Sequence, residues 1–112
     1  MDDQVLRKTI GLRSSCVEDL NVDSEVLGVS VRRQLSKTII VKVSLWAKVL
    51  FHFQDMMINS GEWSDPKVMI ATFKRKNGIY IRQTYHIIST KSEAEKLVSE
   101  LTECFKLGAD HG

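Results

Sequence analysis

The chain is poor in cysteine: only Cys16 and Cys104 occur among its 112 residues. Two cysteines so far apart in the sequence match no zinc-binding pattern, and they provide no framework of disulfides. We therefore expect both thiols to be reduced, as is usual inside cells.

Long apolar runs are also lacking. A helix needs about 20 predominantly apolar residues to cross a bilayer, but Lys37, Lys42 and Lys48 interrupt the longest candidate. The first residues, Met1-Asp2-Asp3, lack the positive charge and the apolar core of a signal peptide. We expect a cytoplasmic protein with no membrane partner.

Motifs for catalysis are absent as well. The sequence has no glycine-rich phosphate loop, no nucleophile motif and no acidic residues at metal-ligand spacing. His52 lies beside apolar residues and is more typical of packing than of catalysis, and His111 lies in a tail. We therefore expect no enzyme, and neither a metal nor a cofactor.

Net charge and length set further bounds. A formal charge of +2 is far below that of proteins that coat duplex DNA, so an electrostatic role requires local clustering. The length fits one domain. We expect residues 1–24 to be a poorly defined N-terminal segment, where Val5, Leu6, Ile10 and Leu12 could line a short helix, and residues 25–112 to form the domain.

The first half of the domain predicts two strands and a helix. Residues 26–34 and 38–43 are rich in β-branched side chains and are separated by a polar break at Ser36. From Leu45 to Asn59, apolar residues recur every three or four positions, with Ser44 as N-cap and Gly61 beyond the end, which predicts a helix. A near-heptad register also allows that helix to begin earlier and replace the second strand.

The apolar stripe of this middle helix, from Trp46 to Met57, is most simply part of the core. A seam for self-association is the alternative, since methionine and aromatic residues suit such a surface.

The next segment predicts a β-hairpin around the turn Asn77-Gly78, the strongest short hairpin signal. A two-residue turn pairs Lys76 with Ile79, Lys74 with Ile81, Ile70 with Tyr85, and Val68 with Ile87. Because side chains alternate along a strand, one face is expected to meet the core. That face comprises Val68, Ile70, Ile79, Ile81, Tyr85 and Ile87. The opposite face comprises Phe73, Arg75, Tyr80, Arg82, Thr84 and His86.

The second face mixes arginine with aromatic rings, the two elements that single-strand binders combine for phosphate contact and base stacking. The predicted nucleic-acid-binding residues are Lys67, Phe73, Lys74, Arg75, Lys76, Tyr80, Arg82 and His86. The alternative interpretation is a solvated strand face, on which basic residues discourage aggregation between sheet edges.

A C-terminal amphipathic helix follows the hairpin. Thr90 and Ser92 each precede a glutamate by three residues, as in a capping box, and Gly108 follows the last turn. Its apolar stripe is expected to cover the apolar hairpin face, and its outer side is acidic. The stripe comprises Ala94, Leu97, Val98, Leu101 and Phe105. The predicted fold class is therefore α+β: an antiparallel sheet of two hairpins packed against the middle helix and the C-terminal helix.

Residues 73–82, followed by Ile88-Ser89-Thr90 and a helix, resemble the final strands and helix of the single-stranded-DNA-binding proteins of the positive cofactor four and Whirly types. The resemblance covers about a third of the chain. It implies a dimer that binds single strands on a curved sheet, with backbone contacts from Lys74, Arg75, Lys76 and Arg82 and stacking on Phe73 and Tyr80. The middle helix departs from that pattern. The hairpin and helix also resemble the arm-binding domains of tyrosine recombinases, which grip duplex DNA.

These observations lead to two functional hypotheses. The first is a homodimeric nucleic-acid-binding protein that prefers single strands. The second is a non-enzymatic module for protein–protein interaction or homodimerisation, which uses the stripe from Trp46 to Met57.

Overall fold

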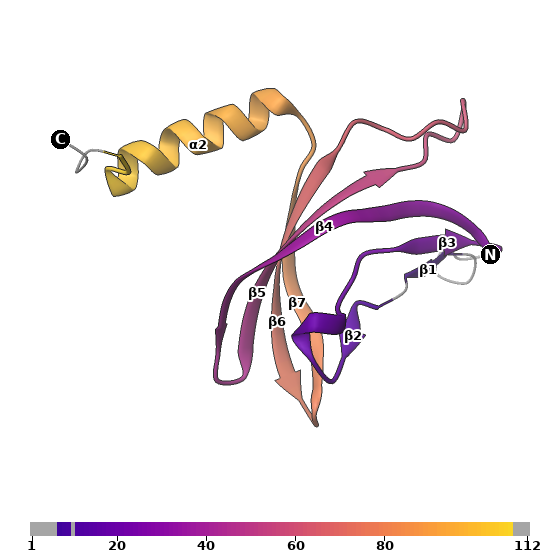
Figure 1. Ribbon diagram of the computed structural model, residues 1–112, viewed down its shortest axis with the longest axis horizontal. Helices are drawn as coiled ribbons and strands as arrows, with labels where there is room; N and C mark the ends of the chain where they lie inside the picture. The colour runs from indigo at the N-terminus through magenta and orange to yellow at the C-terminus, as the bar shows by residue number, and fades with distance from the viewer. Residues whose placement is uncertain (1–6, 10, 109–112) are drawn as a thin grey trace.

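The computed structural model describes residues 7–9 and 11–108. In this part of the chain, seven strands form one antiparallel sheet in the order β1-β3-β4-β5-β6-β7-β2, and one α-helix follows it (Figure 1). The elements are β1 (Arg7–Thr9), β2 (Arg13–Ser14), the 3-10 helix η1 (Val17–Asp19), β3 (Ser24–Val26), β4 (Val29–Val43), β5 (Trp46–Asp55), β6 (Lys67–Lys76), β7 (Ile79–Ile88) and α2 (Lys91–Phe105).

Strands β3 to β7 follow one another as a meander. The β6–β7 hairpin turns at Asn77-Gly78, as predicted, and both residues have positive φ angles of 52° and 80°. Leu27-Gly28 makes a similar turn between β3 and β4, with φ angles of 50° and 82°. Asn and Gly tolerate this left-handed conformation, which matches the twist of the paired strands.

The predicted middle helix is wrong, because residues 46–55 form strand β5. The segment alternates strictly: Ala47, Val49, Phe51 and Phe53 are buried on one face, and the residues between them point the other way. Ser44 is not an N-cap but a turn residue with a φ of 53°. An apolar residue also occurs on the outward side at Trp46 and Leu50, and this produced the apparent helical spacing.

The predicted break at Ser36 is absent too. Strand β4 runs through this position for 15 residues, and it accommodates irregularities between Gln34 and Ser36 and between Ile39 and Val41. Ser36 pairs with His52 of β5, and its Oγ lies 3.3 Å from Nδ1 of that histidine. The polar residue is therefore tolerated on a solvent-facing side of a continuous strand.

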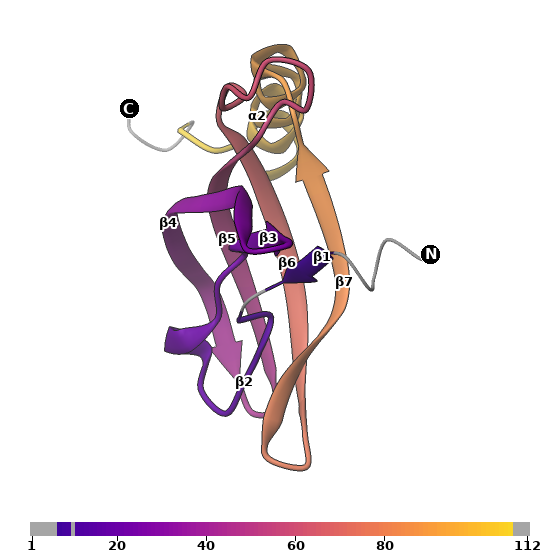
Figure 2. The ribbon, with the colours of Figure 1, turned by 90° about the vertical axis from the view of Figure 1, so that its right-hand side faces the viewer.

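The N-terminal segment joins the two edges of the sheet. Strand β1 pairs with β3 at one edge, and β2 pairs with β7 at the other. Between β2 and β3 the chain passes in front of one sheet face, which we name the inner face (Figure 2). The predicted short helix rested mainly on Val5, Leu6 and Ile10, which lie outside the described residues.

This segment supplies one layer of the core. Val17, Leu20 and Val22 are fully buried against the inner face. The sheet supplies the other layer through Ala47, Val49, Phe51, Phe53, Met69, Ala71, Phe73 and Tyr80. Phe51 and Phe73 make an edge-to-face contact with ring centroids 6.2 Å apart.

Lys37 fixes the position of η1. Its Nζ donates hydrogen bonds to the carbonyl oxygens of Val17 and Leu20, each at 3.0 Å, and to that of Glu18. The ammonium group of Lys37 has three N–H donors, so it can bond to all three carbonyl groups at once. Burial of apolar side chains and the hydrogen bonds from Lys37 hold the segment on the sheet.

The faces of β6, and of β7 up to Arg82, are exchanged relative to the prediction, whereas Tyr85 and Ile87 lie on the core side, as predicted. Phe73 and Tyr80 face the core and are 0% and 4% exposed, whereas Ile79 and Ile81 point outward. The pairs nearest the turn are as predicted, but a bulge at Gln83 shifts the register, so Ile70 pairs with His86 and not with Tyr85. A one-residue slip moves every later side chain to the other face.

The C-terminal helix is confirmed. Thr90 Oγ1 accepts a hydrogen bond from the Glu93 backbone N–H at 3.1 Å, and a Glu93 carboxylate oxygen accepts one from the Ser89 N–H at 3.2 Å. Lys106, in the left-handed region, ends the helix. However, α2 buries none of its residues, so the expectation that it covers the hairpin is wrong within one chain. The fold is an antiparallel sheet with a helix, but not a sheet packed on two helices.

The exchange of hairpin faces can be tested by measuring stability. Phe73→Ala should reduce the free energy of unfolding by about 3–5 kcal/mol, since it removes a fully buried ring. Ile79→Ala, at a position predicted from sequence to lie in the core, should cost about 0.5 kcal/mol or less because its side chain is outside the core. Urea denaturation gives both values. The reverse ranking would contradict the assignment of the inner face.

Candidate functional site

The predicted nucleic-acid-binding residues do not share one surface. Phe73 and Tyr80, the two proposed stacking rings, lie beneath the N-terminal segment in the core. Lys74 and His86 point to the opposite side of the sheet, which we name the outer face. Bases therefore have no access to the rings that the sequence assigned to them.

Two more of the predicted nucleic-acid-binding residues, Arg82 and Lys67, lie on the inner side and contact other side chains of the fold. The guanidinium of Arg82 lies 4.0 Å from the centroid of Tyr85, and a guanidinium nitrogen is 3.7 Å from the sulfur of Met69. Burial lowers the pKa of Arg82, although the group stays charged at neutral pH. Lys67 Nζ is 3.4 Å from the Asp55 carboxylate. These two cations serve packing and ion pairing within the fold.

The remaining cations gather elsewhere. Arg75 and Lys76 are exposed beside the Asn77-Gly78 turn, and Nζ of Lys74 lies 5.3 Å from the centre of the Trp46 ring. His86 is near the other end of β7, where its Nε2 is 3.8 Å from a Glu93 oxygen. Lys74, Arg75 and Lys76 are therefore neighbours only in sequence at the turn, where Arg75 points to the side opposite Lys74 and Lys76, and His86 lies apart from them.

The outer face has the composition of a surface that binds a partner. Its side chains on β5, β6 and β7 are Trp46, Lys48, Leu50, His52, Gln54, Val68, Ile70, Thr72, Lys74, Lys76, Ile79, Ile81, Thr84, His86 and Ile88. This set contains three lysines and two histidines but no carboxylate. Branched aliphatic residues alternate with these cations, and none of the described elements lies over the middle of the face (Figures 1 and 2).

The helix α2 presents a complementary surface. Its stripe of Ala94, Leu97, Val98, Leu101 and Phe105 is largely solvent-exposed; Val98 is 62% and Phe105 71% exposed. The helix carries four glutamates and two lysines, a formal charge of −2. Figure 1 shows it leaving the end of β7 and projecting away from the sheet. Apolar side chains are therefore exposed along its length without a partner in the described chain.

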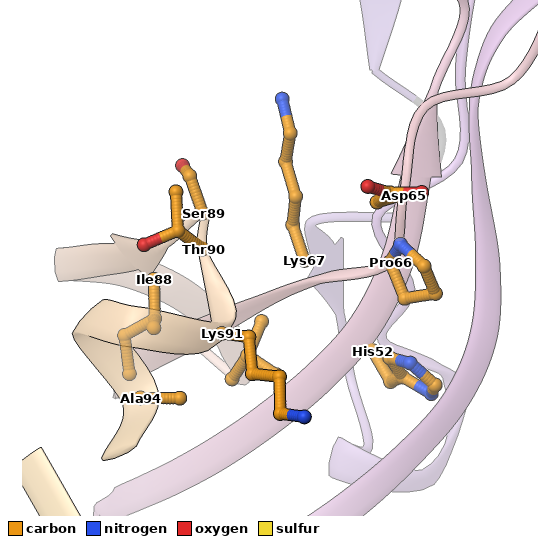
Figure 3. A pocket seen from close by; sticks show the side chains of 10 residues that line it. His52, Asp65, Pro66, Lys67, Ile88, Ser89, Thr90, Lys91 and Ala94 are labelled. Carbon is orange, nitrogen blue, oxygen red and sulfur yellow. The ribbon is translucent and has the colours of Figure 1, made fainter. Parts of the chain in front are cut away.

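A pocket of about 450 Å³ lies at the elbow between α2 and the sheet. Figure 3 shows Ile88, Ser89, Thr90, Lys91 and Ala94 on one side of it, and His52, Asp65 and Pro66 on the other. We call it the elbow pocket. Val68, Ile88 and Ala94 contribute apolar side chains to its lining, and Asp65, Ser89, Thr90 and Lys91 contribute polar ones.

Among residues 7–9 and 11–108, no group of three or more His, Cys, Asp or Glu could hold a metal ion. In the same part of the chain, no helix is long and apolar enough to span a membrane.

Cys16 donates a hydrogen bond to Asp19 Oδ2 at 2.9 Å, which raises the pKa of its thiol and makes it a weaker nucleophile.

An ion-paired cluster closes the inner face near the end of β5. Asp55 accepts hydrogen bonds from Arg32 Nε at 2.6 Å and Nη2 at 3.2 Å, and Arg32 lies 4.5 Å from the centre of the Phe53 ring. Burial alone would raise the pKa of Asp55, but hydrogen bonding and attraction from Arg32 and Lys67 outweigh it and lower the pKa. The cluster is structural.

The sequence did not predict the outer face as a surface, because the spacing of apolar residues in 46–54 predicts a helix. The signal was present: every second residue from Ala47 to Phe53 is apolar, and the residues between them include Lys48 and His52. This alternation is typical of a strand with one buried face.

Comparison with protein-family models, with curated proteins and with solved structures finds no match. Function must therefore be argued from the surfaces of this chain.

The Asp55 cluster gives a pH-dependent prediction. Asp55→Asn should lower the free energy of unfolding by about 1–2 kcal/mol at pH 7, because Arg32 loses its charged partner. Since the folded-state pKa is depressed, the stabilisation is complete above the ordinary value of 3.8 and is lost as pH falls through the folded-state pKa. Denaturation of both proteins from pH 7 to pH 2 should show the two curves converging in acid. A constant difference would contradict this origin.

Proposed function

We propose that this protein is a non-enzymatic self-association module, in which α2 of one copy packs on the outer face of a second copy. The observation that carries the proposal is the apolar stripe of α2, which buries none of its residues within its own chain. Exposed apolar surface of this kind is characteristic of interaction sites, since monomers rarely leave large contiguous patches in water.

The two surfaces match in size. At 1.5 Å per residue, the 15 residues of α2 give a helix about 22 Å long. Strands β4 to β7 lie side by side at about 4.8 Å, so the outer face is roughly 15–20 Å wide. One helix can therefore cross the whole face and place its stripe over Leu50, Val68 and Ile70.

The two surfaces also match in charge. With 3.6 residues per turn, Glu95 and Glu100 lie on opposite flanks of the apolar stripe. Both carboxylates already face a lysine of the same helix, Lys91 at 3.9 Å and Lys96 at 3.4 Å, so the attraction comes from the net charge of −2 on α2. The outer face carries lysines and has no acidic residue on β5, β6 or β7. This complementarity favours a second copy of the chain over a partner of unrelated composition, because both surfaces belong to one sequence.

Reciprocal docking would satisfy both copies at once. In a twofold dimer each chain gives its helix and receives the other, and the same contacts occur twice. The helices then run side by side in opposite directions, which brings Phe105 of each copy toward the elbow pocket of the other. The helix–sheet packing predicted from the sequence would then occur between chains.

This proposal retains part of the alternative drawn from the sequence. Trp46 and Leu50, two members of the stripe from Trp46 to Met57, lie on the outer face, whereas Val49 and Phe53 belong to the core. Nucleic-acid binding on the sheet stays a prediction without its stacking rings, Phe73 and Tyr80.

A single substitution on α2 tests self-association. Leu101→Asp places a charge in the middle of the stripe and should convert a dimer into a monomer at micromolar concentration, with an at least tenfold weaker association. Ser99→Asp, on the opposite side of the same helix, is the matched control and should remain dimeric. Sedimentation equilibrium measures both constants, and circular dichroism verifies the fold of each variant.

Two results would overturn the proposal. The first is a wild-type protein that stays monomeric at all concentrations up to the millimolar range. The second is an equal effect of Leu101→Asp and Ser99→Asp on a dimer, which would show that the stripe is not the contact.

A further inference from the structure

The turns β4–β5 and β6–β7 lie together at the end of the sheet away from α2 (Figure 1). We name residues 42–48 and 74–79 the turn end. The Arg75 backbone N–H donates a hydrogen bond to the Leu45 carbonyl at 2.7 Å, so the two turns are fixed relative to each other. Strands of ten residues separate this end from the elbow by about 33 Å. It is therefore distinct from the elbow pocket.

Apolar side chains are exposed at these turns. Val43 is 62%, Leu45 48% and Trp46 46% exposed, and Ile79 of the second turn is 43% exposed. They belong to neither the inner-face core nor the strip of outer face that a helix would cross above Leu50.

Uncompensated cations surround these apolar residues. In the described part of the chain, no carboxylate forms an ion pair with Lys48, Lys74, Arg75 or Lys76, which lie on two adjacent hairpins, whereas Arg32, Lys67, Lys91 and Lys96 have one. Arg33 and Lys37 also lack a carboxylate partner, but they bond to Gln54 and to backbone carbonyl groups. Lys42 alone at this end has a carboxylate partner, Glu18 at 3.9 Å. The turn end thus concentrates free positive charge around an apolar tip.

We propose that the turn end docks the protein on the surface of an anionic lipid bilayer. Trp46 would lie at headgroup level with Leu45, Val43 and Ile79 beneath it, because an indole ring prefers the boundary between water and hydrocarbon. Lys74, Arg75 and Lys76 would contact the acidic headgroups, and their alkyl stems would cover the apolar tip. Apolar insertion and charge attraction together give reversible binding.

A nucleic acid is the competing partner for these cations. Single-strand binders need several aromatic platforms, whereas Trp46 is the aromatic residue exposed at the turn end, and Lys74 already lies near its ring. Three exposed aliphatic side chains would remain unused against a phosphate backbone. A lipid interface would use both the cations and the aliphatic residues, so an anionic bilayer matches this surface better than a nucleic acid does.

Co-sedimentation with vesicles tests this proposal. We expect the wild-type protein to bind vesicles of phosphatidylcholine with 30% phosphatidylserine, and to bind pure phosphatidylcholine vesicles at least tenfold more weakly. Arg75→Ala/Lys76→Ala should weaken binding to anionic vesicles about 25-fold, since each cation near such a surface contributes about fivefold. Leu45→Asp should abolish the apolar part of the binding.

Matched controls remove the same groups elsewhere. Lys91→Ala/Lys96→Ala deletes two cations on α2, and Ile58→Asp alters a side chain that is 96% exposed in the loop at the opposite end. Both controls should change vesicle binding less than twofold. Intrinsic fluorescence of the wild-type protein should shift to the blue on binding as Trp46 leaves water.

The proposal would be overturned by equal binding to neutral and anionic vesicles, or by equal effects of the turn-end variants and their controls. Salt-sensitive binding to a single-stranded oligonucleotide, lost in Arg75→Ala/Lys76→Ala without any vesicle binding, would assign the turn end to nucleic acid instead. Each outcome is independent of the sedimentation-equilibrium result for Leu101→Asp, so self-association and lipid docking can fail separately.

Discussion

Burial of the N-terminal segment against one face of the sheet determines the rest of the structure. Val17, Leu20 and Val22 cover the inner face, and Lys37 binds the three carbonyl groups around η1. Once this face is occupied, Phe73 and Tyr80 lie in the core, and the aliphatic residues of the same hairpin that point outward range from 43% exposed at Ile79 to 8% at Ile88. The outer face is available for binding because the N-terminal segment covers the inner face.

The chain exposes two surfaces, the outer face and the apolar stripe of α2, that are complementary in size and charge. The outer face is apolar and basic, and α2 is apolar and acidic, yet the elbow at Ser89 and Thr90 holds the helix away from its own sheet (Figure 1). In the proposed dimer, packing between copies would bury both surfaces without bending the elbow. The exposed aliphatic residues at the turn end lie outside that proposed contact and, with Arg75 and Lys76, would form a second binding surface, whereas Lys48 and Lys74 would be shared by both.

Local signals predicted part of this arrangement. The Asn77-Gly78 turn and the Thr90 cap depend on nearby residues alone, and both were predicted correctly. Strand β5 was not, because Trp46 and Leu50 on its outer side imitate helical spacing. The faces of β6, and of β7 up to Arg82, were assigned to the wrong sides, because the bulge at Gln83 places Ile79 and Ile81 opposite to Tyr85 and Ile87. The segment 12–22 that covers the inner face is also distant in sequence. The candidate surfaces depend on those nonlocal features, so the sequence alone assigned binding to rings that are buried.

Isotope-filtered NMR on a mixture of ¹³C-labelled and unlabelled chains tests the central claim most directly, because it detects contacts between copies without a substitution. The account predicts intermolecular contacts from the Leu97 and Leu101 methyl groups of one copy to the Leu50 and Ile70 methyl groups of the other. A dimer with contacts only between the two helices, or a protein with no intermolecular contacts, would contradict it.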